Sequence, residues 1–163
     1  MLNIVLERME EILENNMRDG KKTIVIIDEA HVITDPRIWE GMRLMLNFQS
    51  EQKFYLSLIL LGQPELKDNL SSNKQLLQRI PVRCHLGALK ENETEEYVSH
   101  RLKVAKATKD LFTLDSLKLI HESSGGIPRR INHICDLALF TGMGKGIETI
   151  STEIIRDVAE ELD

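Results

Sequence analysis

The chain has 163 residues, 42% of them hydrophobic and 29% charged, which suffices for one domain or for one compact domain with a helical appendage. A formal net charge of −5 argues against a broad basic surface for nucleic acid, and no apolar run approaches the ~20 residues of a membrane helix. Cys84 and Cys135 have no metal-ligand spacing, so we expect free buried thiols in a reducing compartment, the cytoplasm.

The first part of the chain predicts helices that alternate with strands. Residues 23–27 form an unbroken apolar run, typical of a strand buried on both faces in a parallel sheet covered by helices. Asp35 and Pro36 combine an N-cap with a proline at the first helical position. The expected elements are a helix over 2–17, a strand over 23–27, a helix over 36–49, a strand over 55–61, short helices around 66–70 and 74–79, and a short third strand over 82–86.

From Leu89 onward the pattern predicts helices only. The break at 125–128 and the capping residues before the last helix divide this part into four helices, expected over 94–105, 113–123, 129–141 and 151–162. We therefore predict two domains, an α/β part over residues 1–89 and a helical part over residues 90–163.

Two adjacent carboxylates, Asp28 and Glu29, follow the first predicted strand directly. Ligands of open α/β sheets bind beyond the carboxyl ends of the strands, so both acids fall where chemistry is expected. In P-loop ATPases such a pair is the Walker B element, in which the first acid orients Mg²⁺ and the second polarises the attacking water. The alternative is a plain strand followed by a helix whose acidic first turn suits the helix dipole.

Three further motifs follow in order along the chain. The second strand ends in the polar sequence 61–66, Leu-Gly-Gln-Pro-Glu-Leu, and a short helix over 75–80 carries Arg79. The sequence 125–132, Gly-Gly-Ile-Pro-Arg-Arg-Ile-Asn, then opens a helix with an arginine pair. Each motif alone is weak evidence, but their order and spacing restrict the interpretation.

Together these motifs resemble the later portion of an AAA+ ATPase, and the wording is most similar to the general secretion pathway protein A (ExeA-like) family. The matching phrases lie at 26–31, 61–66, 95–102 and 126–132, so the resemblance covers essentially the whole chain. It implies an incomplete AAA+ P-loop-type parallel sheet with flanking helices, followed by a four-helix lid. It also implies a family of enzymes that hydrolyse ATP with Mg²⁺ and that help to assemble secretion or pilus machinery.

The resemblance assigns roles to individual residues. These are Asp28 for the Mg²⁺ hydration shell, Glu29 for the attacking water, Gln63 as sensor 1, Arg129 as sensor 2 in the lid, and Arg79 as arginine finger with Arg83 as its substitute. Gln63 is also a plain turn residue, and Arg79 suits the C-terminal end of a helix dipole. We expect Arg130 to be a surface residue and the five histidines, which lack metal spacing, to have polar or packing roles.

The resemblance departs from a complete ATPase at the Walker A segment. No glycine-rich loop ending in Gly-Lys-Ser or Gly-Lys-Thr precedes the acid pair, and residues 142–146 lack a preceding strand. We therefore expect the chain alone neither to bind ATP tightly nor to hydrolyse it. The strands over 23–27 and 55–61 should pair while 82–86 loses its neighbour, and such exposed edges predict a dimer or a swapped assembly.

Two other functions stay open at this stage. One is an AAA+ ATPase of the DNA transposition or replication type, which the acidic balance disfavours and salt-dependent DNA binding would favour. The other is a non-catalytic interaction module that keeps the scaffold, which the missing Walker A segment supports.

Overall fold

The computed structural model describes residues 2–49 and 53–162. The chain divides into two compact units, Met1–Cys84 and His85–Asp163. The expected division into an α/β nucleotide-binding part over 1–89 and a helical lid over 90–163 stays a prediction. In the described ranges, no helix is both long enough and apolar enough to span a bilayer.

In its described residues, the first unit contains two strands and a set of short and medium helices. Its elements are α1 (Leu2–Arg18), β1 (Thr23–Ile27), the 3-10 helix η1 (Ala30–Val32), α2 (Pro36–Met45), β2 (Leu56–Leu60), α3 (Glu65–Ser71) and α4 (Lys74–Leu77). The predicted start of α2 is confirmed, because an Asp35 carboxylate oxygen accepts the N–H of Arg37 at 2.9 Å and Pro36 is the first helical residue.

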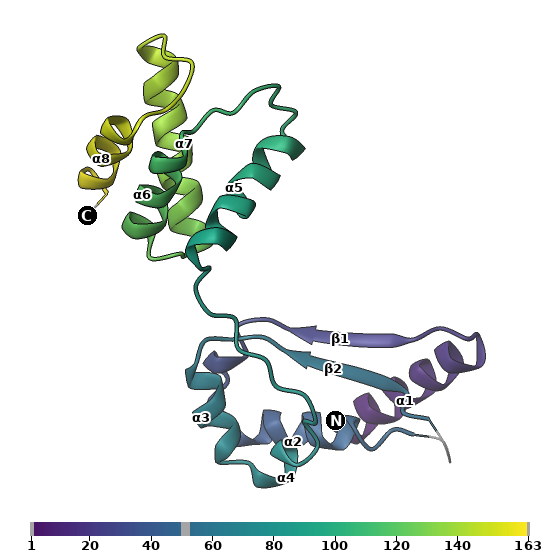
Figure 1. The fold of residues 1–163 in the computed structure, drawn as a ribbon. Coiled ribbons are helices and arrows are strands. Elements are labelled where there is room, and N and C mark those ends of the chain that lie inside the picture. Colours follow the sequence, from purple (N-terminus) through teal and green to yellow (C-terminus); the bar gives the residue numbers. More distant parts are fainter. Residues whose placement is uncertain (1, 50–52, 163) are drawn as a thin grey trace. The chain divides into compact units, whose positions relative to one another are not determined.

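The two strands pair in parallel, in a register that runs from Thr23 opposite Leu56 to Ile27 opposite Leu60, which confirms the expected pairing. Helices α1 to α4 lie on one side of this sheet (Figure 1). On its other face, Ile24 and Ile26 are 57% and 60% exposed. The expectation of a strand buried on both faces is therefore wrong here. A parallel strand is covered twice only where helices lie on both sides, and the described part of this unit covers one side.

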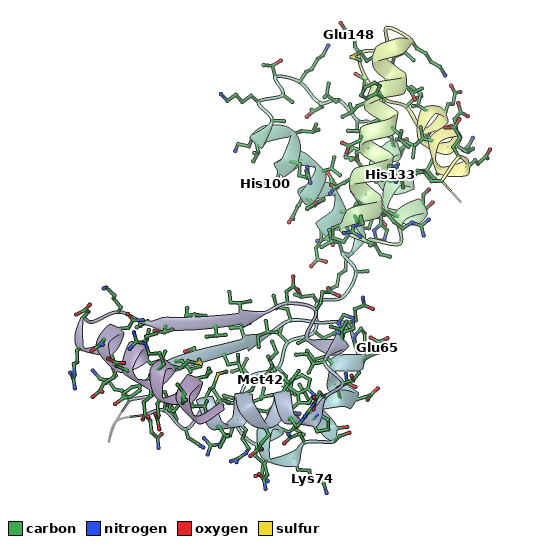
Figure 2. The ribbon with its side chains drawn as sticks, turned by 180° about the vertical axis from the view of Figure 1, so that it is seen from behind. Met42, Glu65, Lys74, His100, His133 and Glu148 are labelled. Atoms are coloured by element: carbon green, nitrogen blue, oxygen red, sulfur yellow. The ribbon has the colours of Figure 1, made fainter. Side chains whose placement is uncertain are left out.

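The core of the first unit lies between the sheet and its helices. Its buried members are Ala30, Trp39, Met42, Leu70 and Leu76. Met42 of α2 lies beneath the sheet, while Lys74 projects outward from α4 (Figure 2). The helices therefore pack against one face of β1 and β2.

The expected third strand over 82–86 is not formed. Those residues have no regular structure, and Val82 and Leu86 are 78% and 89% exposed. A strand is stabilised by a neighbour that accepts and donates its backbone hydrogen bonds, and no described strand lies beside this segment.

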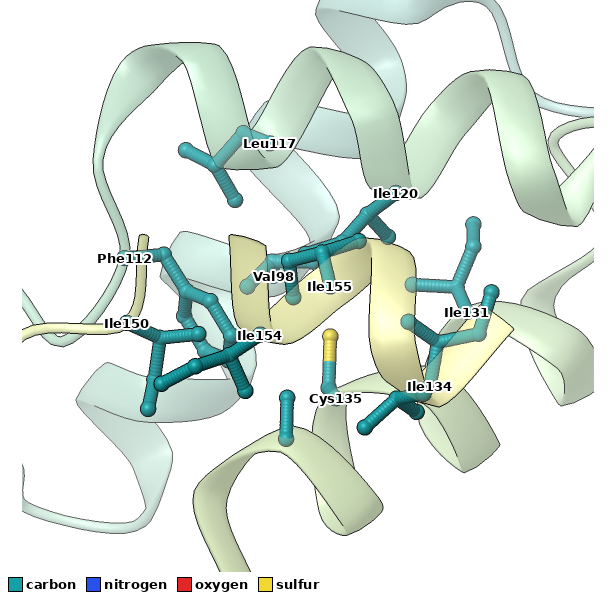
Figure 3. Packing of buried hydrophobic residues seen from close by; sticks show 12 residues of the cluster. Val98, Phe112, Leu117, Ile120, Ile131, Ile134, Cys135, Ile150, Ile154 and Ile155 are labelled. Carbon is teal, nitrogen blue, oxygen red and sulfur yellow. The ribbon is translucent and has the colours of Figure 1, made fainter. Parts of the chain in front are cut away.

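The second unit is a four-helix domain, as expected. Its helices are α5 (Glu91–Val104), α6 (Leu114–Ser124), α7 (Pro128–Gly144) and α8 (Thr152–Glu160). The side chain of Thr113 caps α6 by accepting the N–H of Ser116 at 3.2 Å. Isoleucines from α6, α7 and α8 are prominent in the core, and Ile120, Ile131 and Ile155 have no exposed surface (Figure 3).

Candidate active site

The acid pair lies in the turn that follows β1. Asp28 accepts the backbone N–H of Glu29 at 2.8 Å through Oδ1, and both side chains are exposed. Glu29 has a left-handed backbone, with φ 52° and ψ 32°, which costs a non-glycine residue about 1 kcal/mol. The chain reverses sharply at Glu29 and enters η1 at Ala30, so two carboxylates face solvent at the strand end.

Backbone pairing continues beyond the two strands and connects the turns that follow them. The N–H of Leu61 donates to the carbonyl of Ile27 at 2.9 Å, and the N–H of Ala30 donates to the carbonyl of Leu61 at 2.8 Å. Ala30 is completely buried. These two bonds bring the turn that carries Glu29 beside the turn that carries Gln63.

His31 is the side chain that lies between the two turns. Its Nδ1 accepts the backbone N–H of Gln63 at 3.3 Å, and its Nε2 lies 3.4 Å from Oε2 of Glu29. The carbonyl of His31 accepts a hydrogen bond from the side-chain amide of Asn69 at 2.7 Å. From the sequence, His31 is predicted to have only an ordinary polar or packing role. The signal for more was its position two residues after Glu29, inside one tight turn.

Gly62 leaves the space that His31 occupies. A Cβ at this position would lie 3.1 Å from the backbone nitrogen of His31 and 3.2 Å from its Nδ1. Most side chains would therefore force the imidazole away from the end of β2. Gln63 itself is exposed, so its side-chain amide reaches solvent at the same sheet edge as the acid pair.

Arg79 and Arg83 both contact carbonyl groups near helix ends. Arg79 Nη1 donates to the carbonyl of Leu46, the C-cap residue of α2, at 3.3 Å. Arg83 Nη2 donates to the carbonyl of Leu77 at the end of α4, at 3.5 Å. Both side chains are exposed. Each guanidinium therefore lies where the helix dipole favours a cation, and for Arg79 this helix is α2. The expected helix over 75–80 is shorter, because α4 ends at Leu77 and Arg79 lies in the turn after it. The arginine-finger role stays a prediction.

Arg129 belongs to the second unit. It follows Pro128 directly, as the second residue of α7, and is exposed. The helix dipole disfavours a cation in the first turn, so helix stability does not explain an arginine there. The preceding turn is closely packed. The N–H of Leu89 donates to the carbonyl of Gly126 at 2.8 Å, and a Cβ on Gly126 would collide with the carbonyl of Leu89. The sensor 2 role stays a prediction.

A polar cluster connects α5 to the beginning of α7. The hydroxyl of Tyr97 donates to Oδ1 of Asn132 at 3.1 Å and accepts a hydrogen bond from Arg101 at 3.3 Å. The hydrogen bond from Arg101 lowers the pKa of the Tyr97 hydroxyl. No sequence motif predicts this cluster, because its three residues are spread over two helices.

The two cysteines differ in their surroundings. Both are free, and Cys135 is buried in the helical core, where burial raises the pKa of its thiol to about 12. Cys84 is exposed, in the segment that does not form the third strand. The expectation of two buried thiols is therefore wrong for Cys84, because its burial depended on a strand pairing that this unit does not make.

The candidate site offers a metal ion one carboxylate rather than a preformed cage. Among the described residues, no group of three or more histidine, cysteine, aspartate or glutamate side chains could hold a metal. Mg²⁺ usually keeps several of its waters and takes only one or two carboxylates, so the exposed Asp28 fits its requirements. His100 and His133 lie on the outside of their helices (Figure 2).

Sequence comparisons relate the chain to AAA domains. The family model for the AAA domain matches residues 3–70. General secretion pathway protein A of Aeromonas hydrophila is 38% identical over 151 residues, which are 91% of this chain and 27% of that protein. An uncharacterised HTH-type transcriptional regulator of Methanocaldococcus jannaschii is 24% identical over 163 residues, 96% of this chain and 39% of that protein.

Solved structures with the same fold include two AAA+ proteins. The ORC2 protein of Aeropyrum pernix, in its ADPNP-ADP complexes, has a TM-score of 0.71 at 20% identity. The match covers 96% of this chain and 43% of the ORC2 chain. A RuvB variant of Thermotoga maritima has a TM-score of 0.65 at 15% identity. The match covers 94% of this chain and 49% of the RuvB chain. At these identities the likeness shows the fold alone.

The α/β fold class of the chain is confirmed, because it shares the fold of the solved AAA+ ATPases that it resembles. The chain is related to general secretion pathway protein A, and its residues 3–70 match the AAA domain. The chain spans about a quarter of the length of that relative, 27%.

Proposed function

We propose that this chain supplies the Walker B, sensor 1 and lid parts of an ATP-hydrolysing site, in a protein that helps to assemble secretion or pilus machinery. The observation that carries the proposal is the backbone ladder among Ile27, Ala30 and Leu61, which brings the turn of Glu29 beside that of Gln63. Two polar turns at the ends of neighbouring parallel strands are the usual location of ligand chemistry in α/β sheets.

Each of the three strand-end residues would have a separate task. Bound Mg²⁺–ATP would supply the phosphoanhydride bond and the divalent charge. Asp28 would hold the water shell of the metal, because its exposed carboxylate uses only Oδ1 toward the Glu29 N–H. Glu29 would orient and polarise the attacking water, and the side-chain amide of Gln63 would contact that water or the γ-phosphate.

Two arginines would complete the charge stabilisation. Phosphoryl transfer spreads negative charge over the phosphoryl oxygens, so cations around them lower the barrier. Arg129 would reach from the lid as sensor 2, which its exposed place in the first turn of α7 supports. Arg79, or Arg83 in its place, would act on the site of a neighbouring copy, because both side chains are exposed.

The proposed assembly is a dimer or a swapped oligomer of this chain. The uncovered face of the sheet exposes Ile24 and Ile26, and each strand has one edge without a described partner. Sedimentation velocity over a wide range of concentrations should show mass increasing with concentration. A clean monomer at every concentration would contradict this part of the proposal.

The chain by itself should bind ATP weakly and should not hydrolyse it, because it has no Gly-Lys-Ser or Gly-Lys-Thr loop to cradle the phosphates. A titration with a fluorescent ATP analogue measures this directly. Micromolar affinity would contradict the expectation.

The full proposal is tested by grafting the chain in place of the 151 matching residues of the Aeromonas hydrophila relative. We expect the grafted protein to hydrolyse ATP and to restore secretion in cells that lack the relative. Glu29→Gln should lower kcat about 100-fold or more, since a water-activating group contributes at least this factor. Glu10→Gln, at an exposed position of α1, is the matched control and should leave kcat unchanged. Equal activity of the two variants would refute the role of Glu29.

A further inference from the structure

The imidazole of His31 lies between two groups that the proposed function assigns to one reaction centre. Its ring is only 14% exposed, although the Glu29 carboxylate that it approaches is 62% exposed. The backbone of His31 is anchored independently of the ring, because Asn69 donates to its carbonyl at 2.7 Å. The ring is therefore held at a defined place between the two turns.

The contacts of the ring determine which nitrogen carries the proton. The backbone N–H of Gln63 points at Nδ1, at 3.3 Å, so Nδ1 must be the acceptor and carry no proton. In the neutral ring the proton is then on Nε2, which lies 3.4 Å from Oε2 of Glu29. One nitrogen thus accepts from the turn after β2, and the other lies 3.4 Å from the carboxylate after β1, within the range of an electrostatic contact.

We propose that His31 is a positioning residue that couples the Glu29 carboxylate to the Gln63 turn, so that the two groups move together. This inference rests on the proposed function for the roles of Glu29 and Gln63. The close approach of Gly62 supports it, because a glycine there lets the ring contact the end of β2. A displacement of either turn would break one of the two contacts of the ring.

The competing explanation is that the ring only fills space. The two explanations differ in what the nitrogens do, and this difference can be measured on the 163-residue chain without nucleotide. The nitrogen-15 shifts of the His31 ring should show the Nε2–H tautomer. A ring with its proton on Nδ1, or on both nitrogens, would overturn the proposal, and this measurement requires no variant.

Three substitutions separate the two contacts. His31→Phe keeps a ring of similar volume and removes both nitrogens. His31→Asn keeps a carbonyl oxygen near the place of Nδ1 and does not reach Glu29, whereas His31→Gln places an amide N–H near Nε2 and leaves the Gln63 N–H without its acceptor. In all three variants the Asn69 bond should be retained, because its acceptor is the backbone carbonyl of residue 31.

Two readouts follow the contacts. Hydrogen exchange of the Gln63 amide should accelerate about fivefold or more in His31→Phe and His31→Gln and stay near the wild-type rate in His31→Asn. The side-chain signals of Glu29 should show increased averaging in His31→Phe and His31→Asn, with wild-type order kept in His31→Gln. The Ala30 amide, bonded to the Leu61 carbonyl, is the internal control and should keep its exchange rate.

If His31→Phe leaves both readouts at the wild-type values, the ring is only a packing group and the proposal is refuted. The same holds if His31→Asn and His31→Gln give identical patterns. Because these measurements use no ATP, they can succeed while the grafted protein shows no hydrolysis, and the reverse outcome is equally recognisable.

Discussion

The backbone N–H of Leu89 donates to the carbonyl of Gly126 at 2.8 Å, which fastens the segment before α5 to the turn between α6 and α7. Gly126 has a φ of 71°, and a Cβ at this position would point at the carbonyl of Leu89. Since α7 begins at Pro128, this contact determines where Arg129 enters its helix. The position of the expected sensor 2 residue thus depends on a glycine three residues before it in the chain.

Gly126→Ala should destabilise the helical unit by about 2–4 kcal/mol, because the methyl group adds a backbone collision to the cost of a left-handed alanine. Gly125→Ala is the matched control: its φ is 61° but open space surrounds it, so only about 1–2 kcal/mol is expected. Urea unfolding followed by circular dichroism measures both. An equal loss in the two variants would show that the Leu89 contact is unimportant.

The two thiols should differ in their reaction with a thiol reagent. Cys84 is exposed and should react at once in the native chain, whereas the buried Cys135 should react only as the helical unit opens. Absorbance of the released reporter should therefore show one fast thiol in buffer and two in urea. Cys84→Ser should abolish the fast phase, and a fast phase that persists would contradict the burial of Cys135.

Burial of Cys135 should also make stability depend on pH. Its pKa is raised from 9.0 to about 12, so above pH 9 the unfolded thiol loses a proton that the folded thiol keeps. The folded state then binds more protons, and stability falls as pH rises through this window, by about 1.4 kcal/mol per pH unit from this group. Unfolding of wild type and Cys135→Ala between pH 8 and pH 11 measures the difference, which should shrink as pH rises.

The Tyr97 hydroxyl should ionise at a lower pH than an ordinary tyrosine. The hydrogen bond from Arg101 holds its pKa below the usual 10.0. The tyrosinate absorbance of wild type minus that of Tyr97→Phe isolates this group. Arg101→Gln should move the midpoint upward, while Lys103→Gln, also in the last turn of α5, is the control and should leave it in place.

Gly62→Ala should disturb the contact between His31 and the Gln63 turn. The added methyl would lie 3.2 Å from Nδ1 of His31, so the imidazole must shift by a few tenths of an ångström, and we expect a loss of about 1 kcal/mol. Gly41→Ala, in open space within α2, should instead stabilise the unit by about 0.5–1 kcal/mol through helix propensity. Fluorescence of the single tryptophan, Trp39, reports unfolding of this unit for both variants.

Local signals in the sequence predicted most of the elements. Asp35 with Pro36 marked the start of α2, and Thr113 marked that of α6, because a cap is a contact within a few residues of the chain. The parallel pairing of β1 with β2 was also expected, and with it the common edge of the acid pair and Gln63.

Contacts between distant residues decided the rest. The segment 82–86 has strand-forming residues but lies beside no strand in the described ranges, so it stays irregular and leaves Cys84 exposed. Likewise, the burial of β1 on only one face depends on where the helices pack, which its own five residues do not encode. His31 is the clearest case. The sequence determines that a histidine follows the acid pair, but only the approach of Gly62 and Gln63 from the next strand gives its two nitrogens separate partners.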